Sequence, residues 1–376
     1  MENQSSFFRD LKIIELASVL AGPSVGQFFA ELGAEVIKVE NPKTNGDVTR
    51  SWKGAKENTD DISAYFACIN WGKKSVALDV STGDGLNQLY KLIESADIVI
   101  TSYKPGDDKK LKVDYESLKK INPELIYGQI TGYGAITDRV GYDAIIQAEV
   151  GFMNMNGEAG GEPLKMPVAM MDLLAGHQLK EALLLGYINK LKTGKGSCFQ
   201  VSLIEAGLAS LANQATNYLI GQSEPMRKGS KHPNIAPYGE LFNTKDDKQI
   251  IMAIGNNKQF NSLLHVLHLE QKEEYSTNLL RVSNRDKLYS YLEEAFRTNS
   301  STHLMELFNE MNIPAGIINK VSEAIDLYGG LIKLESNKLQ GLKTFIANSG
   351  QFKNSSHILP PPHLGQHTQE ILASLK

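Results

Sequence analysis

Residues 11–40 read LKIIELASVLAGPSVGQFFAELGAEVIKVE, and this stretch carries the clearest information about the fold. The apolar runs Leu11 to Leu16 and Ala34 to Val39 are typical of buried strands. Between them, Pro23 fits the first turn of a helix and Gly33 fits its end. The stretch therefore predicts a strand–helix–strand unit in a parallel sheet.

The alternation of strand-like and helix-like segments continues to about residue 130. Apolar residues recur at helical spacing in some segments and form short continuous runs in others. We therefore expect an α/β protein with a mostly parallel, doubly wound sheet. The further predicted strands are Ser75 to Leu78, Asp97 to Thr101 and Leu125 to Ile130, and the predicted helices are Gly85 to Ala96 and Tyr115 to Ile121.

The middle of the chain has a different pattern. The apolar segments Leu173 to Leu191 and Ile204 to Ile220 predict two long helices around a strand from Cys198 to Leu203. Residues 221–237 contain three prolines and two glycines, which is typical of a linker. A second compact region is expected from about Tyr238 to Asp326, followed by a tail with a short terminal helix.

The composition is that of an ordinary globular protein. The chain has 376 residues, a hydrophobic content of 41% and a formal net charge of -4, so it lacks the basic excess of a nucleic-acid binder. Its two cysteines, Cys68 and Cys198, exclude a disulfide scaffold and fit a reducing, cytoplasmic setting. The apolar segment Leu173 to Leu191 is too charged to span a membrane, and the polar N-terminus shows no targeting signal.

Common cofactor and metal motifs are missing. The turn from Ala17 to Gly26 reads ASVLAGPSVG and lacks the G-x-G-x-x-G pattern of dinucleotide-binding sites. The chain has no phosphate-binding G-x-x-x-x-G-K-[ST] loop and no G-x-S-x-G elbow. None of the histidine pairs completes a recognised zinc site, so we expect no bound metal.

Asp172 has an unusual setting in PVAMMDLLAG (167–176), where it follows apolar residues and proline and begins a long apolar helix. One interpretation is an N-cap, because aspartate is a preferred capping residue. The other is a covalent nucleophile, since a desolvated carboxylate can attack an acyl group. At a helix N-terminus we expect the carboxylate to be held ionised.

A basic turn at Lys104-Pro105-Gly106 follows the strand that ends at Thr101, and three further lysines come soon after it. Ligands of open α/β sheets bind at the carboxyl ends of strands, so the turn fits a phosphate-binding loop. It fits a solvated basic turn equally well.

An ordered series of motifs resembles the class III CoA-transferases, the group of formyl-CoA transferase, carnitine CoA-transferase and the alpha-methylacyl-CoA racemases. The series begins with the segment from Leu16 to Glu40 and covers nearly the whole chain. One motif alone would carry little weight, whereas the ordered set is highly specific. The others are GDVTR (46–50), NWGKKS (70–75), KPG (104–106), NPELIY (122–127), TGYG (131–134), GYD (141–143), TGKG (193–196), HPNIAPY (232–238) and LGQHT (364–368).

The resemblance implies a fold that the pattern alone only partly reaches. Relatives have a Rossmann-like large domain built from both chain ends, which corresponds to residues 1–220 and 328–376 here. A linker at 221–237 then leads to a smaller α/β domain at 238–327. Two subunits interlock into a homodimer, and each active site lies between domains and subunits.

The resemblance also implies a mechanism in which Asp172 is the nucleophile. Its carboxylate attacks the thioester of an acyl-CoA, and the reaction passes through an aspartyl anhydride and an aspartyl-CoA thioester to a new acyl-CoA. The partners are an acyl-CoA and a small carboxylic acid. Coenzyme A is then a substrate, and no permanently bound cofactor is expected.

Other site residues are carried over from the resemblance. The first turn and the segments after later strands match contacts to CoA, although Asn41 and Ser102 depart from residues common in relatives. A loop near residue 255 matches one that lies near the acyl group. The expected CoA contacts are Val19, Leu20, Ala21, Leu78, Ser102, Tyr103, Lys104, Lys110, Gly141, Tyr142 and Asp143, and the loop residues are Gly255, Asn256 and Asn257.

Position 142 bears on the choice between activities within the family. Racemases carry a histidine there as a second acid/base, whereas this chain has Tyr142. Tyrosine, with an ordinary pKa near 10, is a poor general base at neutral pH, and we expect Tyr142 to act in catalysis by orienting a substrate or donating a hydrogen bond. This favours a CoA-transferase over an acyl-CoA racemase or epimerase, and a non-catalytic acyl-CoA binding protein is the third alternative.

Overall fold

The computed structural model describes residues 7–134, 137, 139–336, 339–346 and 358–375. The chain forms two compact units. The first unit contains Met1–Phe152, Lys165–Ile220 and Leu331–Lys376, and the second contains Met153–Leu164 and Gly221–Gly330.

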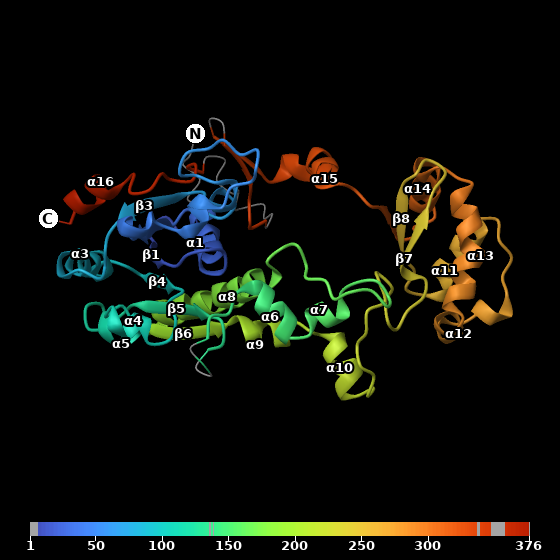
Figure 1. Cartoon of the computed structure of the whole chain (residues 1–376), viewed down its shortest axis with the longest axis horizontal. Helices are drawn as coiled ribbons and strands as arrows, with labels where there is room; N and C mark the ends of the chain where they lie inside the picture. Colours follow the sequence, from blue (N-terminus) through green and yellow to red (C-terminus); the bar gives the residue numbers. More distant parts are fainter. Residues whose placement is uncertain (1–6, 135–136, 138, 337–338, 347–357, 376) are drawn as a thin grey trace. The chain divides into compact units, whose positions relative to one another are not determined.

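A six-stranded parallel sheet forms the centre of the first unit (Figure 1), which confirms the predicted α/β class and the parallel strands. The strand order is β3-β2-β1-β4-β5-β6. In doubly wound sheets of this order, ligands bind beyond the carboxyl ends of the strands where the order reverses, which here is between β1 and β4. The strands are β1 Lys12–Leu16, β2 Glu35–Glu40, β3 Lys73–Ala77, β4 Ile98–Thr101, β5 Ile126–Thr131 and β6 Ser197–Ser202.

Helices cover both faces of this sheet. Ile13 of β1 packs into a core with α1 (Ala21–Glu31) and α8 (Met170–Thr193), whereas its neighbour Ile14 packs into a core with α3 (Gly83–Glu94). Successive side chains of a strand point to opposite faces, so a strand buried on both faces is apolar throughout. This explains why the strands of the first unit stand out as apolar runs.

Shorter elements complete the first unit. The hairpin strands are β10 Lys333–Ser336 and β11 Leu339–Leu342. The helices are η1 Pro42–Thr44, η2 Val48–Ser51, α2 Ala64–Ala67, α4 Asp107–Lys110, α5 Tyr115–Leu118, α6 Asp143–Glu149, α7 Phe152–Met155 (which continues into the second unit), α9 Leu203–Ala209, α10 Asn213–Leu219 and α16 Thr368–Ala373. Among all described helices, none is both long and apolar enough to cross a bilayer.

The C-terminal segment packs along the edge strand β3. The N–H of His367 donates to Ser75 O at 2.9 Å, and the N–H of Ala77 donates to Thr368 Oγ1 at 2.9 Å. The N–H of Gly365 also donates to Ser75 Oγ at 2.9 Å. The motif LGQHT therefore covers an edge that would otherwise expose unpaired backbone groups.

The second unit has its own core around a three-stranded antiparallel sheet of order β7-β8-β9. Phe242 of β7 stacks on Phe296 of α13, with ring centroids 4.2 Å apart. The strands are β7 Tyr238–Asn243, β8 Gln249–Ala253 and β9 Ala315–Ile317. The helices are α11 Asn257–Val266, η3 Glu273–Tyr275, α12 Asn278–Ser283, α13 Arg285–Arg297, α14 Ser301–Glu310, α15 Val321–Tyr328 and η4 Gly329–Leu331, whose last residue belongs to the first unit.

The prediction of one long helix from Ile204 to Ile220 is wrong. The segment forms the two short helices α9 and α10, and between them Ala212 has a φ of +50°. A residue in the left-handed region cannot continue a right-handed helix. The Ser210 hydroxyl donates to Ala206 O at 2.7 Å, a local bond that competes with helix continuation.

Candidate active site

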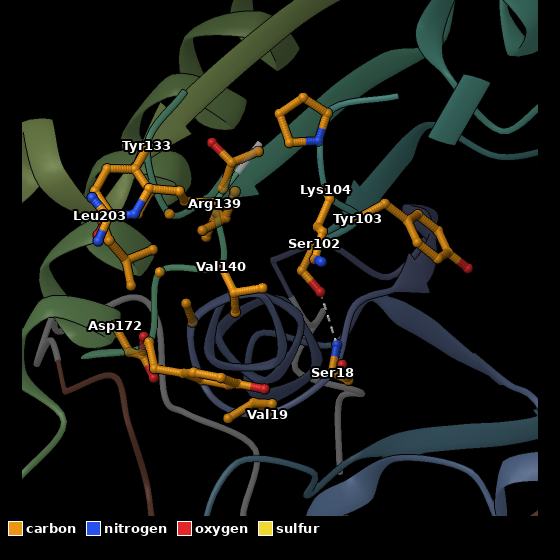
Figure 2. A pocket seen from close by; sticks show the side chains of 17 residues that line it. Ser18, Val19, Ser102, Tyr103, Lys104, Tyr133, Arg139, Val140, Asp172 and Leu203 are labelled. Carbon is orange, nitrogen blue, oxygen red and sulfur yellow. Dashed lines mark hydrogen bonds between the residues drawn. The ribbon is translucent and has the colours of Figure 1, made fainter. Parts of the chain in front are cut away.

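A cavity of about 240 Å³ lies at the carboxyl ends of β1, β4 and β5. Figure 2 shows that the segments after these strands and the start of α8 contribute its walls. This is the edge at which open α/β sheets bind ligands. Its lining is Ser18, Val19, Ala21, Ser102, Tyr103, Lys104, Pro105, Ile130, Thr131, Gly132, Tyr133, Arg139, Val140, Gly141, Tyr142, Asp172 and Leu203.

A second, larger cavity of about 750 Å³ shares Val19, Tyr142 and Asp172 with the first one. Asp172 therefore belongs to the wall that the two cavities have in common. The remaining lining residues are Leu20, Trp52, Ala64, Tyr65, Cys68, Ile69, Asp143, Ala144, Lys165, Pro167, Val168, Ala169, Leu173, Gln340, Gly341, Leu342, Lys343 and Thr344.

Asp172 does not cap the helix, so the capping interpretation is wrong. Helix α8 begins at Met170 and its N-cap is Ala169, which places Asp172 at the third helical position. The residue is 8% exposed. Burial and then the charge of Asp143 raise the pKa of Asp172 to about 7. The expectation of a firmly ionised carboxylate is corrected, because lost solvation and a neighbouring negative charge both disfavour the anion.

Asp143 links α6 to the start of α8. Its Oδ1 accepts the N–H of Met171 at 2.7 Å, and its Oδ2 accepts from Gln147 Nε2 at 2.7 Å. A carboxylate from another helix thus satisfies one of the free N–H groups of the first turn of α8. Asp143 thereby fixes the backbone next to Asp172 and places a negative charge near it.

Tyr142 is the N-cap residue of α6 and is 59% exposed. It lines both cavities together with Asp172. Tyr65, another aromatic residue of the larger cavity, is less exposed than Tyr142. Its burial, and then the charge of Asp172, raise the pKa of Tyr65 to about 12. Its hydroxyl therefore stays protonated at neutral pH and can donate a hydrogen bond.

The first turn and the turn after β4 meet at the smaller cavity. The N–H of Ser18 donates to Ser102 Oγ at 3.1 Å, the bond drawn in Figure 2. Ser102 thus joins the two turns through its own hydroxyl. Of the other expected CoA contacts, Val19, Ala21, Tyr103, Lys104, Gly141 and Tyr142 also line this cavity, whereas Leu20 and Asp143 line the larger one.

Two expected CoA contacts line neither cavity. Leu78 is 5% exposed and belongs to the core on the α3 face of the sheet. Lys110 lies at the end of α4, and its Nζ is 2.9 Å from Asp107 Oδ1. Leu78 therefore has a packing role, and Lys110 is an exposed residue of α4.

The loop at Gly255, Asn256 and Asn257 belongs to the second unit, where it begins α11. Asn256 caps the helix by accepting the N–H of Gln259 at 2.9 Å, and the N–H of Gly255 donates to Gln259 Oε1 at 2.9 Å. Arg281 also donates to Asn257 Oδ1 at 2.9 Å. Hydrogen bonds with side chains thus hold this loop, which contains a single glycine, in its conformation.

Several cavity residues were not predicted from the sequence. Arg139 lines the smaller cavity and pairs with Glu149 at 2.8 Å. Lys165 and Lys343 bring two positive charges to the larger cavity. The proximity of Arg139 to the GYD motif was a usable signal, but no local pattern marks Lys343, which reaches the site from the far end of the chain. Among the described residues, no group of three or more metal-ligating side chains is present.

The fold and this site define an α/β enzyme, and the model of CoA-transferase family III matches residues 8–368. The chain therefore belongs to CoA-transferase family III and is a CoA-transferase, which confirms the resemblance. Enzymes of this family act on CoA thioesters.

Three comparisons support this assignment. The chain is 35% identical over 394 residues to the succinate–glutarate CoA-transferase of Agrobacterium fabrum, covering 100% of this chain and 97% of the relative. It is 37% identical to the succinyl-CoA:glutarate CoA-transferase of Homo sapiens, covering 96% and 84%. A CAIB/BAIF family protein from Brucella suis has a similar structure, with a TM-score of 0.85, 38% identity, and coverage of 97% and 98%.

Proposed function

We propose that this enzyme moves CoA between two small dicarboxylic acids, with Asp172 as the covalent nucleophile. The observation that carries the proposal is the position of Asp172, a buried carboxylate that lines both cavities. The smaller cavity takes the thioester end of acyl-CoA, because it lies at the carboxyl ends of the strands. The larger cavity takes the acid.

The reaction needs four acyl transfers at one carboxylate. The Asp172 carboxylate attacks the donor thioester, which releases the CoA thiolate and forms a mixed anhydride. The thiolate attacks the aspartyl carbonyl of the anhydride, which gives an aspartyl-CoA thioester and frees the donor acid. An acceptor carboxylate attacks this thioester and releases the thiolate again. The thiolate then attacks the acceptor carbonyl of the second anhydride, which yields the new acyl-CoA and restores Asp172.

The raised pKa of Asp172 suits this chemistry. At a pKa of about 7 the carboxylate is a stronger nucleophile than an ordinary aspartate, and enough of it is ionised at neutral pH to react. The protonated hydroxyl of Tyr65 and the exposed hydroxyl of Tyr142 can donate hydrogen bonds to the oxyanions that form. Tyr142 orients substrates in this scheme and does not abstract an α-proton, which separates the enzyme from a racemase.

The dicarboxylate assignment has two supports. The relatives from Agrobacterium fabrum and Homo sapiens carry names that specify succinate or succinyl-CoA together with glutarate. In this chain, Lys165 and Lys343 line the larger cavity, whose other lining side chains are mainly apolar. An ammonium group beside an apolar wall suits a short carbon chain that ends in a second carboxylate.

The remaining features belong to the same proposal. We assign the CoA-binding domain to residues 1–220 and 328–376, the linker to 221–237 and the small domain to 238–327. Two such chains form an interlocked homodimer in the cytoplasm, where the free cysteines Cys68 and Cys198 stay reduced. No permanently bound cofactor takes part in the proposed reaction.

The test is the intact mass of the protein after incubation with succinyl-CoA and, separately, with acetyl-CoA. We expect an acid-labile adduct of one CoA moiety on the wild type, which peptide mapping places on Asp172. The isosteric variant Asp172→Asn is expected to carry none. An equal adduct on this variant, or no adduct from any acyl-CoA tried, would remove Asp172 from the nucleophile role.

A further inference from the structure

The turn between β1 and α1 holds a valine in a backbone conformation that valine rarely adopts. Val19 has a φ of +72°, and the left-handed region is strained for a β-branched residue. Val19 also lines both cavities beside Asp172. Such a conformation persists only where the surroundings enforce it, so the neighbours of Val19 have to be identified.

Asp47 is the direct partner of Val19. The N–H of Val19 lies 3.3 Å from each carboxylate oxygen of Asp47 and donates to both. Asp47 is held in turn by Thr49, whose N–H and hydroxyl donate to Oδ1 at 3.0 and 2.8 Å. The N–H of Asp47 donates to Glu40 Oε2 at 3.0 Å. The carboxylate is therefore fixed on several sides.

Lys38 ties the same carboxylate to the residue at the start of the turn. Its Nζ lies 2.9 Å from Asp47 Oδ2 and 3.0 Å from Glu15 Oε1, and it donates to Ala17 O at 2.7 Å. These three partners account for all three protons of the ammonium group. Lys38 thus holds the carbonyl of Ala17 and Asp47 holds the N–H of Val19, and these two charged side chains form an ion pair with each other.

Lys73 extends the cluster to the first turn of α1. Its Nζ lies 2.8 Å from Glu15 Oε2 and donates to Pro23 O at 2.8 Å and to Asn70 Oδ1 at 2.9 Å. The cluster of Glu15, Lys38, Asp47 and Lys73 has no net charge, and each residue is at most 4% exposed. Removal of one member of a buried charged cluster leaves an uncompensated charge, so its geometry resists change.

We propose that Asp47 is a positioning residue for acyl-CoA, because it holds the Val19 turn in the shape that forms the common wall of both cavities. Asp47 itself lines neither cavity and acts through Val19. The inference rests on the proposed function, in which these cavities take the acyl-CoA and the acid.

The test measures the effect of Asp47→Asn in the wild-type protein and in the Val19→Gly variant. Asp47→Asn keeps an oxygen acceptor but removes the charge that pairs with Lys38, and we expect the Kd for CoA and the KM for acyl-CoA to rise about tenfold. Val19→Gly removes the strain, since glycine adopts positive φ without a steric penalty. In the Val19→Gly background, we therefore expect Asp47→Asn to change the Kd much less.

The outcomes for Asp47→Asn, or for a substitute variant, decide the matter. Equal losses of affinity in both backgrounds, or a lower melting temperature with unchanged Kd and KM, would overturn the positioning role. If Asp47→Asn does not fold, Asp47→Glu serves instead, because it retains the charge and displaces the acceptor of Val19. A raised Kd at near wild-type stability supports the proposal, and a wild-type Kd overturns it.

A matched control and a separate readout complete the design. Asp97→Asn breaks the 2.9 Å ion pair with Lys190 at the amino ends of the strands, and we expect its Kd for CoA to equal that of the wild type. CoA binding is measured by calorimetry without turnover. If the wild type forms no adduct on Asp172 while Asp47→Asn still weakens CoA binding, the proposed chemistry fails and the positioning role stands.

Discussion

The charge of Asp143 acts on the pKa of Asp172, the proposed nucleophile. Both burial and Asp143 raise the pKa of Asp172 to about 7, and the reacting form is the carboxylate. Activity should therefore fall as the pH falls through this pKa. In Asp143→Asn, the negative charge is lost while the amide oxygen can still accept the Met171 N–H, so the acid limb of kcat/KM is expected at lower pH.

A pH profile of kcat/KM from about pH 4 to 9 measures this shift, since the raised pKa of Asp172, about 7, lies within this range and the ordinary pKa of an aspartate, near 4, lies at its acid end. Asp84→Asn, which changes an exposed carboxylate in the first turn of α3, is the control and is expected to leave the profile unchanged. An acid limb that stays in place in Asp143→Asn would show that Asp143 does not influence the ionisation of Asp172.

Lys165 and Lys343 together are expected to make the enzyme prefer dicarboxylates to monocarboxylates. The double variant Lys165→Ala, Lys343→Ala removes both positive charges of the larger cavity. We expect kcat/KM for glutarate as acceptor to fall about tenfold, while the value for butyrate changes little, because butyrate has no second carboxylate to pair. An equal loss for both acids would mean that the lysines do not contact the distal carboxylate.

Individual site residues differ in how well the sequence predicts them. The apolar setting of Asp172 marks it as unusual but leaves an N-cap and a nucleophile open, and its assignment as nucleophile comes from the family resemblance and stays a prediction. Its pKa is not predictable, because the contact between Asp143 and the start of α8 joins residues 28 positions apart. The role of Asp47 is similarly hidden, since the motif GDVTR gives no sign that its aspartate meets Val19.

At the scale of elements, Glu31 joins α1 to the segment that lines the larger cavity. It accepts the N–H of Thr344 at 2.8 Å and the N–H of Phe345 at 3.0 Å, and it is 2% exposed. Glu31→Ala leaves both N–H groups without this acceptor, so we expect the free energy of unfolding to fall by about 2–4 kcal/mol. Hydrogen exchange at Thr344 and Phe345 should accelerate.

Glu31→Gln is the matched control, because its side-chain oxygen can still accept one of the two N–H groups. Its loss of stability in denaturant unfolding is expected to be about half that of Glu31→Ala or less. Unchanged exchange at Thr344 in Glu31→Ala would contradict the anchoring role of Glu31.

Elements are predictable where burial leaves a local pattern. The strand predicted at Leu11 to Leu16 is found as Lys12–Leu16, because both faces of the central sheet are covered and the strand is apolar throughout. The single helix from Ile204 to Ile220 fails, since the apolar pattern of the segment does not reveal the positive φ of Ala212, where the helix is interrupted.

At the scale of the whole molecule, a series of exposed apolar side chains on α8 to α10 needs an explanation. Leu185, Ile188 and Leu191 recur every three residues along α8, and Leu185 and Leu191 are 64% and 69% exposed. Large apolar side chains that recur in exposed positions along one helix are typical of an interaction site. The proposed homodimer accounts for it, since a second copy of the chain would bury these residues. The other exposed apolar residues here are Leu208, Tyr218, Leu219 and Ile220.

We therefore expect sedimentation to give a particle of twice 41.4 kDa. Leu185→Glu together with Ile188→Glu places two carboxylates in the buried interface, which carries a large desolvation cost, and should convert the dimer to monomer or prevent its assembly. The control is Leu279→Glu, because Leu279 is 75% exposed but lies on α12 of the second unit. Its mass and activity should match those of the wild type. A wild type that sediments as a 41.4 kDa monomer with full transferase activity would exclude the dimer as a requirement for the site, because Asp172 and both cavities would then function within one chain.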